Sequence, residues 1–321
     1  MINKNLFLSE KILTDQVERV PTRNGFGEGL VEAGRKDKNV VALCADLTES
    51  VRMEAFAKEF PERFIEVGVA EQNLVTVAAG MAHVGKIPFV ASYGAFAPGR
   101  CWEQIRTTIC YNDQPVKIAG AHTGISVGPD GATHQMLEDI ALMRALPNMI
   151  VMAPCDSVET KKATIAAAVN GLPTYIRFGR EKTSVMTTEK TPFAIGKAQV
   201  FRKGEKVTII ACGTVVYEAL LAAEEVDGEL INCTTIKPLD GETILESVKK
   251  TGRVVTVEEH QTTGGLGGVV AEFLMEHYPV PMRRVGVHDR FGESGEPDEL
   301  LRKFGLKAED IIEEKEENFT E

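Results

Sequence analysis

Residues 64–80 read FIEVGVAEQNLVTVAAG, a short apolar run that passes directly into a helical pattern. Its first part, residues 64–69, is apolar enough for a buried strand. The apolar positions that follow repeat with the spacing of one helix face: Leu74, Val75, Ala78 and Ala79. Glu71 lies where the strand would meet the helix. The role of a carboxylate at this junction has to be inferred from the rest of the sequence.

The same alternation of strand and helix continues on both sides of this stretch. In the first half the other strand-like segments are residues 39–44, 87–92, 116–121, 149–153 and 173–178. Helical patterns lie between them, at residues 23–35, 52–60, 102–111, 135–145 and 157–170. The strands are continuous apolar runs, which is typical of a parallel sheet covered on both faces.

A polar, strand-poor segment separates this half of the chain from a second one, at residues 181–192. After it the alternation restarts, with strands at 206–212, 229–233 and 253–258 and helices at 215–223, 241–250 and 269–276. We therefore expect an α/β protein with a parallel-sheet domain over residues 1–185 and a smaller α/β domain over residues 193–321. The acidic tail from Lys307 is expected to be helical or frayed.

The composition indicates a globular protein and argues against a nucleic-acid-binding or membrane-spanning one. With 43% apolar and 26% charged residues, the chain of 321 residues is typical of a globular protein. The formal net charge of -11 and the lack of a basic stripe argue against nucleic-acid binding. No stretch approaches the length of a membrane span, and the six cysteines form no C-x-x-C pair. We expect buried free thiols and a cytoplasmic location.

Polar and aromatic side chains follow the ends of several strand-like segments. They are Asp46, Ser50, Glu71, Tyr93, Phe96, His122, Asp130 and His134. Because parallel strands end at one edge of a sheet, and ligands bind outside that edge, we expect these side chains to converge. The two aromatic residues also have a second interpretation, as members of the core.

Glu71 itself has two interpretations. Its carboxylate suits the free N–H groups at the start of a helix, where the helix dipole favours a negative charge. The same carboxyl group in an apolar setting would instead share a proton with a ligand nitrogen. The pattern alone does not choose between a helix cap and a catalytic acid.

The loop from His122 to His134 is rich in glycine, which lets the backbone approach a ligand closely. Its two imidazoles and Asp130 are groups that transfer protons and bind anions near neutral pH. One alternative is a plain turn in which Thr133 caps the next helix. Another is a metal site of His122, Asp130 and His134, although their spacing matches no recognised metal-binding pair.

Two further features suggest anion binding. The arginines that could clamp a phosphate are Arg23, Arg100, Arg106, Arg177 and Arg180. The glycine run at residues 264–268 precedes a helix and resembles a phosphate cradle. It lacks the Lys and Ser/Thr of a P-loop, so packing or a tight turn is the alternative.

Together these stretches resemble the transketolase family of thiamine diphosphate enzymes, over residues 22–305. In the first half the resemblance rests on Asp46-Leu47, residues 66–73, the loop end Gly131-Ala-Thr-His-Gln135 and Ile176-Arg-Phe-Gly-Arg180. In the second half it rests on Thr235-Ile-Lys-Pro-Leu239, Val257-Glu-Glu-His260 and Arg290-Phe-Gly-Glu-Ser294. The matching region is the part of a transketolase that comprises the pyrimidine-binding and C-terminal domains, as in the C-terminal subunit of a split transketolase.

The resemblance implies how the cofactor would be bound. Glu71 matches the family glutamate that hydrogen-bonds the aminopyrimidine ring of thiamine diphosphate and promotes proton transfer there. Phe96 matches the aromatic residue that stacks on this ring, with Tyr93 in the same pocket wall. A third aromatic residue of the family is replaced here by Gly99, so the pocket has to be completed differently.

The resemblance also implies how the substrate would be bound. His134 matches a histidine that contacts the ketose near its reactive carbon, which makes it a catalytic residue beside Glu71. Asp130 matches an aspartate that reads the configuration of the sugar hydroxyls. The positions that hold the sugar phosphate are matched by Arg23, Ser50, His122 and Arg180. The neighbouring Arg177 is a competing choice for the last of these.

One family motif is missing from the chain, the Gly-Asp-Gly with a later Asn that binds the diphosphate and the metal. The resemblance therefore implies that this chain supplies the pyrimidine half of the site and no metal ligand. The diphosphate and its Mg²⁺ or Ca²⁺ would be held by a partner, the transketolase N-terminal subunit. We expect an assembly of two chains of each kind.

The implied activity is that of a transketolase of the pentose phosphate pathway, which transfers a two-carbon ketol unit from a ketose phosphate to an aldose phosphate. The alternatives are a beta subunit of a 2-oxoacid dehydrogenase, a relative of deoxyxylulose-phosphate synthase, and a non-catalytic subunit with the same fold. The candidate phosphate-binding residues favour sugar phosphates over 2-oxo acids. A non-catalytic role is disfavoured because Glu71, Phe96, Asp130 and His134 are all present.

Overall fold

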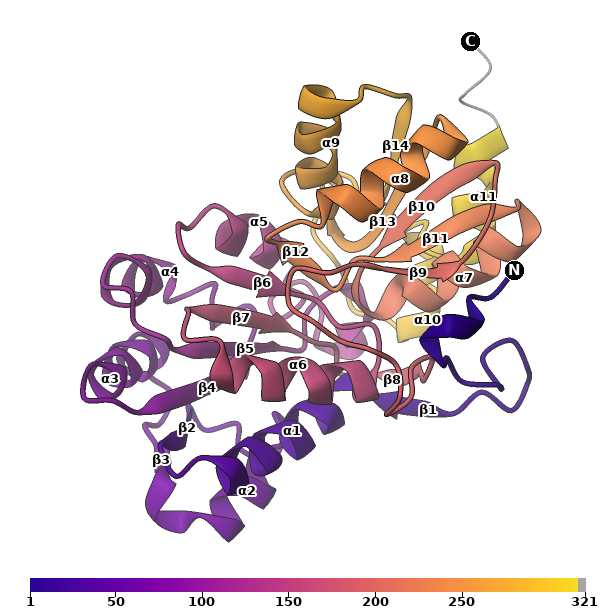
Figure 1. Ribbon diagram of the computed structural model, residues 1–321. Coiled ribbons are helices and arrows are strands. Elements are labelled where there is room, and N and C mark those ends of the chain that lie inside the picture. Colours follow the sequence, from indigo (N-terminus) through magenta and orange to yellow (C-terminus); the bar gives the residue numbers. More distant parts are fainter. Residues whose placement is uncertain (317–321) are drawn as a thin grey trace.

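Strands from the first half of the chain pair in parallel in one sheet (Figure 1). In this computed structural model, which describes residues 1–316, they are β2 (Val40–Cys44), β3 (Phe64–Glu66), β4 (Ile87–Tyr93), β5 (Lys117–Ala121), β6 (Ile150–Met152) and β7 (Thr174–Arg177). Their order across the sheet is β6, β7, β5, β4, β2 and β3. The expected parallel-sheet fold is therefore confirmed.

Helices cover both faces of this sheet. They are α1 (Thr22–Lys36), α2 (Glu54–Glu59), α3 (Glu71–His83), α4 (Trp102–Gln104), the π-helix Ile105–Cys110, α5 (Asp139–Arg144) and α6 (Ser157–Val169). Alternate residues of β2 show the two layers: Val41 and Leu43 belong to the core cluster that contains α3, and Val40 and Ala42 to the one that contains α1 and α6. Burial on both faces explains why β2 is a continuous apolar run.

Two glycines let α1 approach α6 closely. A Cβ added to Gly25 would lie 1.8 Å from the carbonyl oxygen of Ser157, and one added to Gly29 would lie 2.8 Å from that of Lys161. Only glycine leaves room for these backbone contacts. The contact fixes the beginning of α1, where Arg23 lies, against α6.

The second half of the chain forms its own sheet, in the order β14, β13, β10, β11 and β9 (Figure 1). The strands are β9 (Gln199–Arg202), β10 (Val207–Ala211), β11 (Gly228–Asn232), β13 (Val254–Gln261) and β14 (Met282–Val287). All their pairings are parallel except that of β9 with β11. The helices are α7 (Val216–Glu225), α8 (Gly241–Thr251), α9 (Leu266–His277), α10 (Pro297–Lys303) and α11 (Ala308–Glu316).

The two halves are joined more closely than the sequence pattern indicated. Strand β12 (Thr235–Lys237) comes from the second half but pairs antiparallel with β6, at the edge of the first sheet. At the other end of the chain, the backbone N–H of Asn3 donates to the carbonyl oxygen of Phe201 at 2.9 Å, which ties the N-terminal arm to β9. Each half thus supplies a segment to the other.

Three local details differ from the expectations. The segment 181–192 contains a strand, β8 (Lys182–Ser184), which pairs with β1 (Arg19–Pro21). The expected helix 135–145 begins only at Asp139, because the side-chain amide of Gln135 donates to the carbonyl oxygens of Ile125 and Glu293 and keeps the preceding residues in the loop. Most of the expected helix 102–111 is π-helical.

The remaining expectations concern thiols and membranes. All six cysteines are free and buried, as expected. Within residues 1–316 there is no helix with the length and apolar composition that crossing a bilayer requires.

Candidate active site

Four rings that the sequence singled out lie together beyond the carboxyl ends of β4 and β5. The Tyr93 ring stacks on the imidazole of His122 with 3.9 Å between ring centroids. The imidazole of His134 meets the Phe96 ring edge-on at 5.4 Å, and Tyr93 and Phe96 are 6.0 Å apart. Both aromatic residues are only partly buried, so the wall that they form is accessible to a ligand. Tyr93 also packs against the core cluster that contains α1 and α6, so its second interpretation, as a member of the core, holds in part.

Glu71 opens α3, and its carboxylate is 2% exposed. One of its oxygens, Oε2, accepts a hydrogen bond from Nη1 of Arg100 at 2.8 Å. The guanidinium of Arg100 also lies 4.7 Å from the centre of the Phe96 ring. The carboxylate is therefore paired with a guanidinium group, and the choice between a helix cap and a shared proton stays a prediction.

His122 is a buried imidazole with an open hydrogen-bonding position. The residue is 2% exposed, and among the described residues no group hydrogen-bonds its Nδ1 atom. Burial, followed by the charges of Arg23, Arg180 and Arg52, lowers the pKa of His122 to about 3. The ring is thus neutral near pH 7, and a buried polar atom without a partner is a candidate for ligand binding.

Guanidinium groups surround this imidazole. Nη1 of Arg23 donates to the backbone oxygen of Ser50 at 3.0 Å, whereas its buried Nε finds no acceptor within residues 1–316. Arg180 is 33% exposed, and its Nη1 lies 3.5 Å from Oδ1 of Asp130. Burial and the positive charges of Arg52 and Arg180 lower the pKa of Arg23. Such a concentration of cations favours an anionic ligand.

Arg52 belongs to this group, and the sequence reasoning missed it. Its Nε donates to Oδ1 of Asn24 at 3.1 Å, and its backbone φ of 63° places it in a tight turn after β2. The signal that could have found it is position, because it follows Ser50 by two residues in the same strand-end loop.

Arg177, the competing choice for a phosphate ligand, is already engaged. Its Nε pairs with Oδ2 of Asp139 at 2.8 Å, and its Nη2 donates to the carbonyl oxygen of Glu259 at 2.7 Å. The residue is 4% exposed. Arg177 is therefore a structural cation, and Arg180 is the arginine of this segment that faces the cluster.

The glycine run 264–268 also has a structural use. The backbone N–H groups of Leu266 and Gly267, at the start of α9, donate to the carboxylate of Glu258 at 2.7 and 2.8 Å. A side-chain carboxylate thus occupies the place that a phosphate would take. The alternative interpretation of this run, packing and turning, is confirmed.

The metal-site alternative finds no matching geometry. In the described part of the chain no three His, Cys, Asp or Glu side chains are grouped so as to hold a metal ion. Asp130 faces Arg180, and His122 is stacked on Tyr93.

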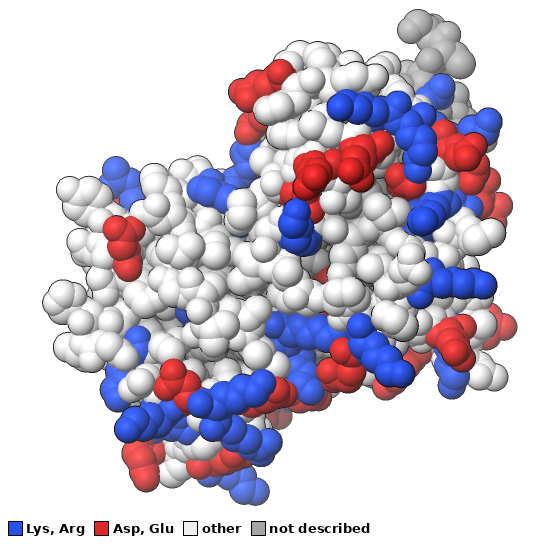
Figure 2. Space-filling model, in the orientation of Figure 1, with Lys and Arg blue, Asp and Glu red and all other residues white. Residues whose placement is uncertain are grey.

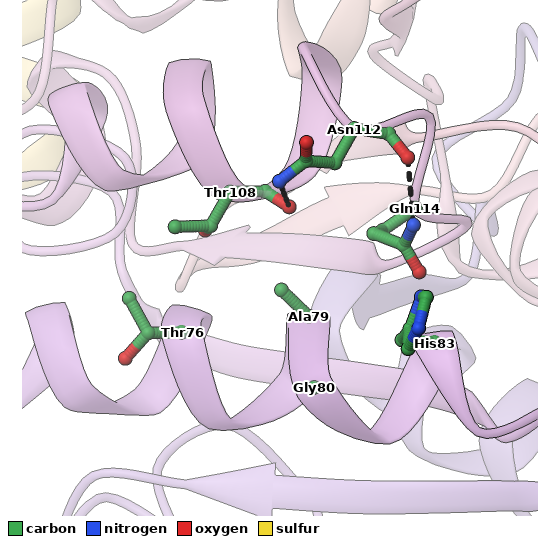
Figure 3. A pocket seen from close by; sticks show the side chains of 7 residues that line it. All are labelled: Thr76, Ala79, Gly80, His83, Thr108, Asn112 and Gln114. Atoms are coloured by element: carbon green, nitrogen blue, oxygen red, sulfur yellow. Dashed lines mark hydrogen bonds between the residues drawn. The ribbon is translucent and has the colours of Figure 1, made fainter.

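A separate pocket of about 470 Å³ lies between α3 and the π-helix (Figure 3). Its lining contains no Asp, Glu, Lys or Arg and none of the residues described above: Thr76, Ala79, Gly80, His83, Thr108, Asn112 and Gln114. Three apolar side chains next to the ends of these two helices are strongly exposed, Val69 at 71%, Val84 at 74% and Tyr111 at 85%. The pocket is thus part of an outer face of the first sheet layer and not of the ring cluster.

Comparisons with known proteins agree with this geometry. Two family models match the chain, the transketolase pyrimidine binding domain over residues 18–185 and the transketolase C-terminal domain over residues 196–311. A protein of Methanocaldococcus jannaschii, described provisionally as a transketolase C-terminal section, is 47% identical over 90% of this chain and 93% of its own length. The 6-deoxy-6-sulfo-D-fructose transketolase subunit of a Clostridium species is 44% identical, over 90% of this chain and 92% of that subunit.

A solved structure leads to the same family. It is a split gene transketolase in an inactive beta4 tetramer, 44% identical to this chain, with a TM-score of 0.86. The match covers 92% of this chain and 97% of that one. The chain therefore belongs to the transketolase family, of which it carries the pyrimidine-binding and the C-terminal domain.

Proposed function

We propose that this chain is the C-terminal subunit of a two-chain transketolase, which transfers a two-carbon ketol unit from a ketose phosphate to an aldose phosphate. The observation that carries the proposal is the grouping beyond β4 and β5. There a buried carboxylate, an aromatic wall and two imidazoles lie beside three guanidinium groups. Carboxylate and imidazole move protons at a reacting carbonyl, and the guanidinium groups bind the phosphate.

The groups around Glu71 would hold the aminopyrimidine end of thiamine diphosphate. In the structure a planar group with N–H donors, the guanidinium of Arg100, lies over the Phe96 ring and hydrogen-bonds Glu71. An aminopyrimidine ring has the same requirements, namely an aromatic face and a carboxyl group at its edge. When bound, the cofactor would supply the nucleophilic carbon that attacks the ketose carbonyl. Glu71 would hold the proton shared with the ring nitrogen, and Phe96 and Tyr93 would form the wall.

The sugar phosphate would lie across the ring cluster, toward the arginines. Arg23, Arg180 and the added Arg52 would neutralise its phosphate, with Ser50 at the same end of the site. His122 is neutral, so its free Nδ1 atom is able to bind a hydroxyl group or a phosphate oxygen without charge repulsion from the arginines. His134 and Asp130 would contact the hydroxyl groups near the reacting carbon.

The diphosphate end of the cofactor requires a partner, which we propose to be a transketolase N-terminal subunit that holds Mg²⁺ or Ca²⁺. The proposed assembly has two chains of each kind. Its contact surface would include the outer face at α3 and the π-helix, with the pocket shown in Figure 3. In Figure 2 the surface over α3 and α4 shows few charged side chains, which suits a subunit contact.

The substrate class is the finer part of the proposal. One relative is named for a sulfonated sugar, and guanidinium groups bind sulfonate as well as phosphate. We propose phosphorylated sugars of pentose phosphate metabolism as substrates, and a cytoplasmic location, which suits the six free thiols.

The alternative functions are less well supported. A 2-oxoacid dehydrogenase subunit and a deoxyxylulose-phosphate synthase relative are not favoured, and the site residues argue against a non-catalytic subunit.

The test uses the purified chain alone and mixed with its N-terminal partner, in the presence of thiamine diphosphate and Mg²⁺. Xylulose 5-phosphate and ribose 5-phosphate serve as donor and acceptor, and the sulfonated and unphosphorylated ketoses serve as comparisons. We expect ketol transfer from the mixture only, with preference for the phosphorylated donor. Activity of the chain alone would contradict the shared site, and use of 2-oxo acids in place of sugars would contradict the assignment.

A further inference from the structure

The loop from His122 to His134 is held in place by the second half of the chain. The carboxylate of Glu259, on β13, is 2% exposed. Its Oε1 accepts a hydrogen bond from the backbone N–H of Ser126 at 2.6 Å, inside the loop. Its Oε2 accepts one from the hydroxyl of Thr214 at 2.6 Å, on its own side of the boundary between the halves. One carboxylate therefore joins the loop to the second sheet.

The loop has a glycine where the carboxylate of Glu259 packs against it. Gly124 has a φ of 88°, and a Cβ added there would lie 2.5 Å from Cδ of Glu259. A side chain at position 124 would thus exclude Glu259 and would strain the backbone as well. Beyond the anchor, the side-chain amide of Gln135 donates to the carbonyl oxygen of Glu293 at 2.9 Å. The loop contacts the second half at both ends.

In the sequence, the anchored backbone amide of Ser126 lies midway between two residues of the proposed sugar site. His122 precedes Ser126 by four residues, and Asp130 follows it by four residues. His122 itself has a φ of 53°, so its position depends on a backbone conformation that the surroundings have to maintain. A shift of the loop at Ser126 would therefore displace both side chains.

We propose that Glu259 is a positioning residue for substrate binding, through which the C-terminal domain orients the loop that carries His122, Asp130 and His134. The inference rests on the proposed function and assigns to the C-terminal domain a task at the active site. Glu71 lies outside the loop, whereas the wall residues Tyr93 and Phe96 contact the rings of His122 and His134. We therefore expect the tether to affect substrate binding more than cofactor binding.

The first test measures the loop directly in the isolated chain, by hydrogen–deuterium exchange of the segment 122–134. In Glu259→Ala we expect the Ser126 amide to exchange at least about 10-fold faster, since a hydrogen bond to a buried carboxylate is lost. Glu229→Ala is the matched control. Glu229 is 5% exposed in the same sheet, and its side chain pairs with Lys250 away from the loop. Unchanged exchange in Glu259→Ala, or an equal increase in the control, would overturn the proposal.

The second test uses the assembled two-chain enzyme. For Glu259→Ala we expect KM for the ketose phosphate to rise about 10-fold, with a smaller change, within about 3-fold, in the dissociation constant for thiamine diphosphate. Glu259→Gln should stay within about 3-fold of the unaltered enzyme, because an amide oxygen accepts from Ser126 and the amide N–H₂ donates to Thr214. Thr214→Val removes only the second tether, so KM should rise by less than in Glu259→Ala.

The two kinds of failure are distinguishable. If the unaltered complex transfers no ketol unit, the proposed function fails, while the exchange experiment still decides the anchoring role of Glu259. If the complex is active and KM in Glu259→Ala is unchanged, the positioning role is wrong. A loss of cofactor affinity as large as the rise in KM would also overturn it, because the tether would then not act mainly on substrate binding.

Discussion

The carboxyl ends of the two sheets carry similar groups and use them differently. Beyond β4 and β5, buried polar atoms lack partners in the described part of the chain, among them Nδ1 of His122 and Nε of Arg23. At the corresponding end of β13, the carboxylate of Glu258 binds two backbone amides, and that of Glu259 binds an amide and a hydroxyl. The first edge has polar atoms available to a ligand, whereas at the second edge the protein itself supplies the hydrogen-bond partners of both carboxylates.

The difference shows how a ligand site is distinguished from structural polarity. Both edges contain buried carboxylates, and both contain glycine-rich loops. What separates them is whether the protein itself completes the hydrogen bonds, because a buried polar group that lacks a partner is costly unless a ligand or water supplies one. The predictions below test this comparison, from the largest expected effect to the smallest.

Glu71→Ala should have the largest effect on activity. It removes the carboxyl group that would exchange a proton with the cofactor ring, so we expect kcat of the two-chain enzyme to fall by about 10²- to 10⁴-fold. The fold should persist, because the change relieves the burial of a carboxylate. The measurement is steady-state ketol transfer, with circular dichroism as the check on folding.

Glu258 provides the contrasting variant, as it is also buried but binds the start of α9. Glu258→Ala should lower the free energy of unfolding by about 1–3 kcal/mol, because two backbone N–H groups lose their acceptor. The kcat of the folded fraction should change little. A loss of kcat as large as that of Glu71→Ala would show that the two edges are not functionally different.

His122 should make the stability of the chain depend on pH. Its pKa is about 3 in the folded state against 6.5 for a free histidine, so the unfolded state binds more protons between these values. Stability should therefore fall as the pH drops below 6.5 and should keep falling to about pH 3. Between pH 7 and pH 4.5 this amounts to about 2–3 kcal/mol.

The measurement is urea unfolding at both pH values for the unaltered chain and for His122→Gln, which should lose less stability on acidification. His288→Gln is the control, because that histidine is exposed. It should behave like the unaltered chain. If His122→Gln did so too, the imidazole would not be held neutral by its surroundings.

Arg180→Ala should weaken binding of the sugar phosphate more than it slows the reaction. Loss of a charged hydrogen bond to phosphate corresponds to roughly a 10- to 30-fold increase in KM, with a smaller change in kcat. Arg35→Ala serves as the control, since Arg35 is exposed and pairs with Glu59 on the surface. An equal loss with an unphosphorylated ketose would show that Arg180 does not act on the phosphate.

Much of the fold could be predicted because buried parallel strands are read directly from apolar runs. Strand β12 could not be, since a strand of three residues that crosses to another sheet is stabilised by partners far away in the sequence. Gln135 was misread for a similar reason, because its amide donates to a carbonyl 158 residues away. The division into domains 1–185 and 193–321 stays a prediction.

The residue types of the site could be predicted from the sequence, but the contacts that these residues make with one another could be predicted less well. The placement of His122, Tyr93, Phe96 and His134 followed from the rule that ligand sites lie beyond the carboxyl ends of parallel strands. The choice between Arg177 and Arg180 depended on burial beside Asp139, which sequence does not show. Arg52 and Arg100 gained their importance only from contacts in three dimensions.

Arg100 gives the smallest effect and the sharpest test of the ligand site beyond β4 and β5. Its guanidinium rests on Phe96 and pairs with Glu71, in the space proposed for the aminopyrimidine ring, so cofactor binding has to displace it. The Arg100 side chain is 50% exposed, so water screens its charge, whereas the Glu71 carboxylate is 2% exposed, and we expect the ion pair to be of modest strength. Arg100→Ala should therefore bind thiamine diphosphate only about 2- to 5-fold more tightly in the two-chain complex.

Fluorescence of the single tryptophan, Trp102, is a suitable readout, because it lies two residues from Arg100. Titration of the complex with the cofactor would give the dissociation constant for the unaltered chain, Arg100→Ala and Arg100→Lys. The lysine variant should resemble the unaltered chain only in part, since an ammonium group lacks the planar face that stacks on Phe96. Weaker binding in Arg100→Ala would mean that Arg100 moves aside to contact the bound cofactor. The ligand site beyond β4 and β5 would then include a fourth ligand-binding arginine.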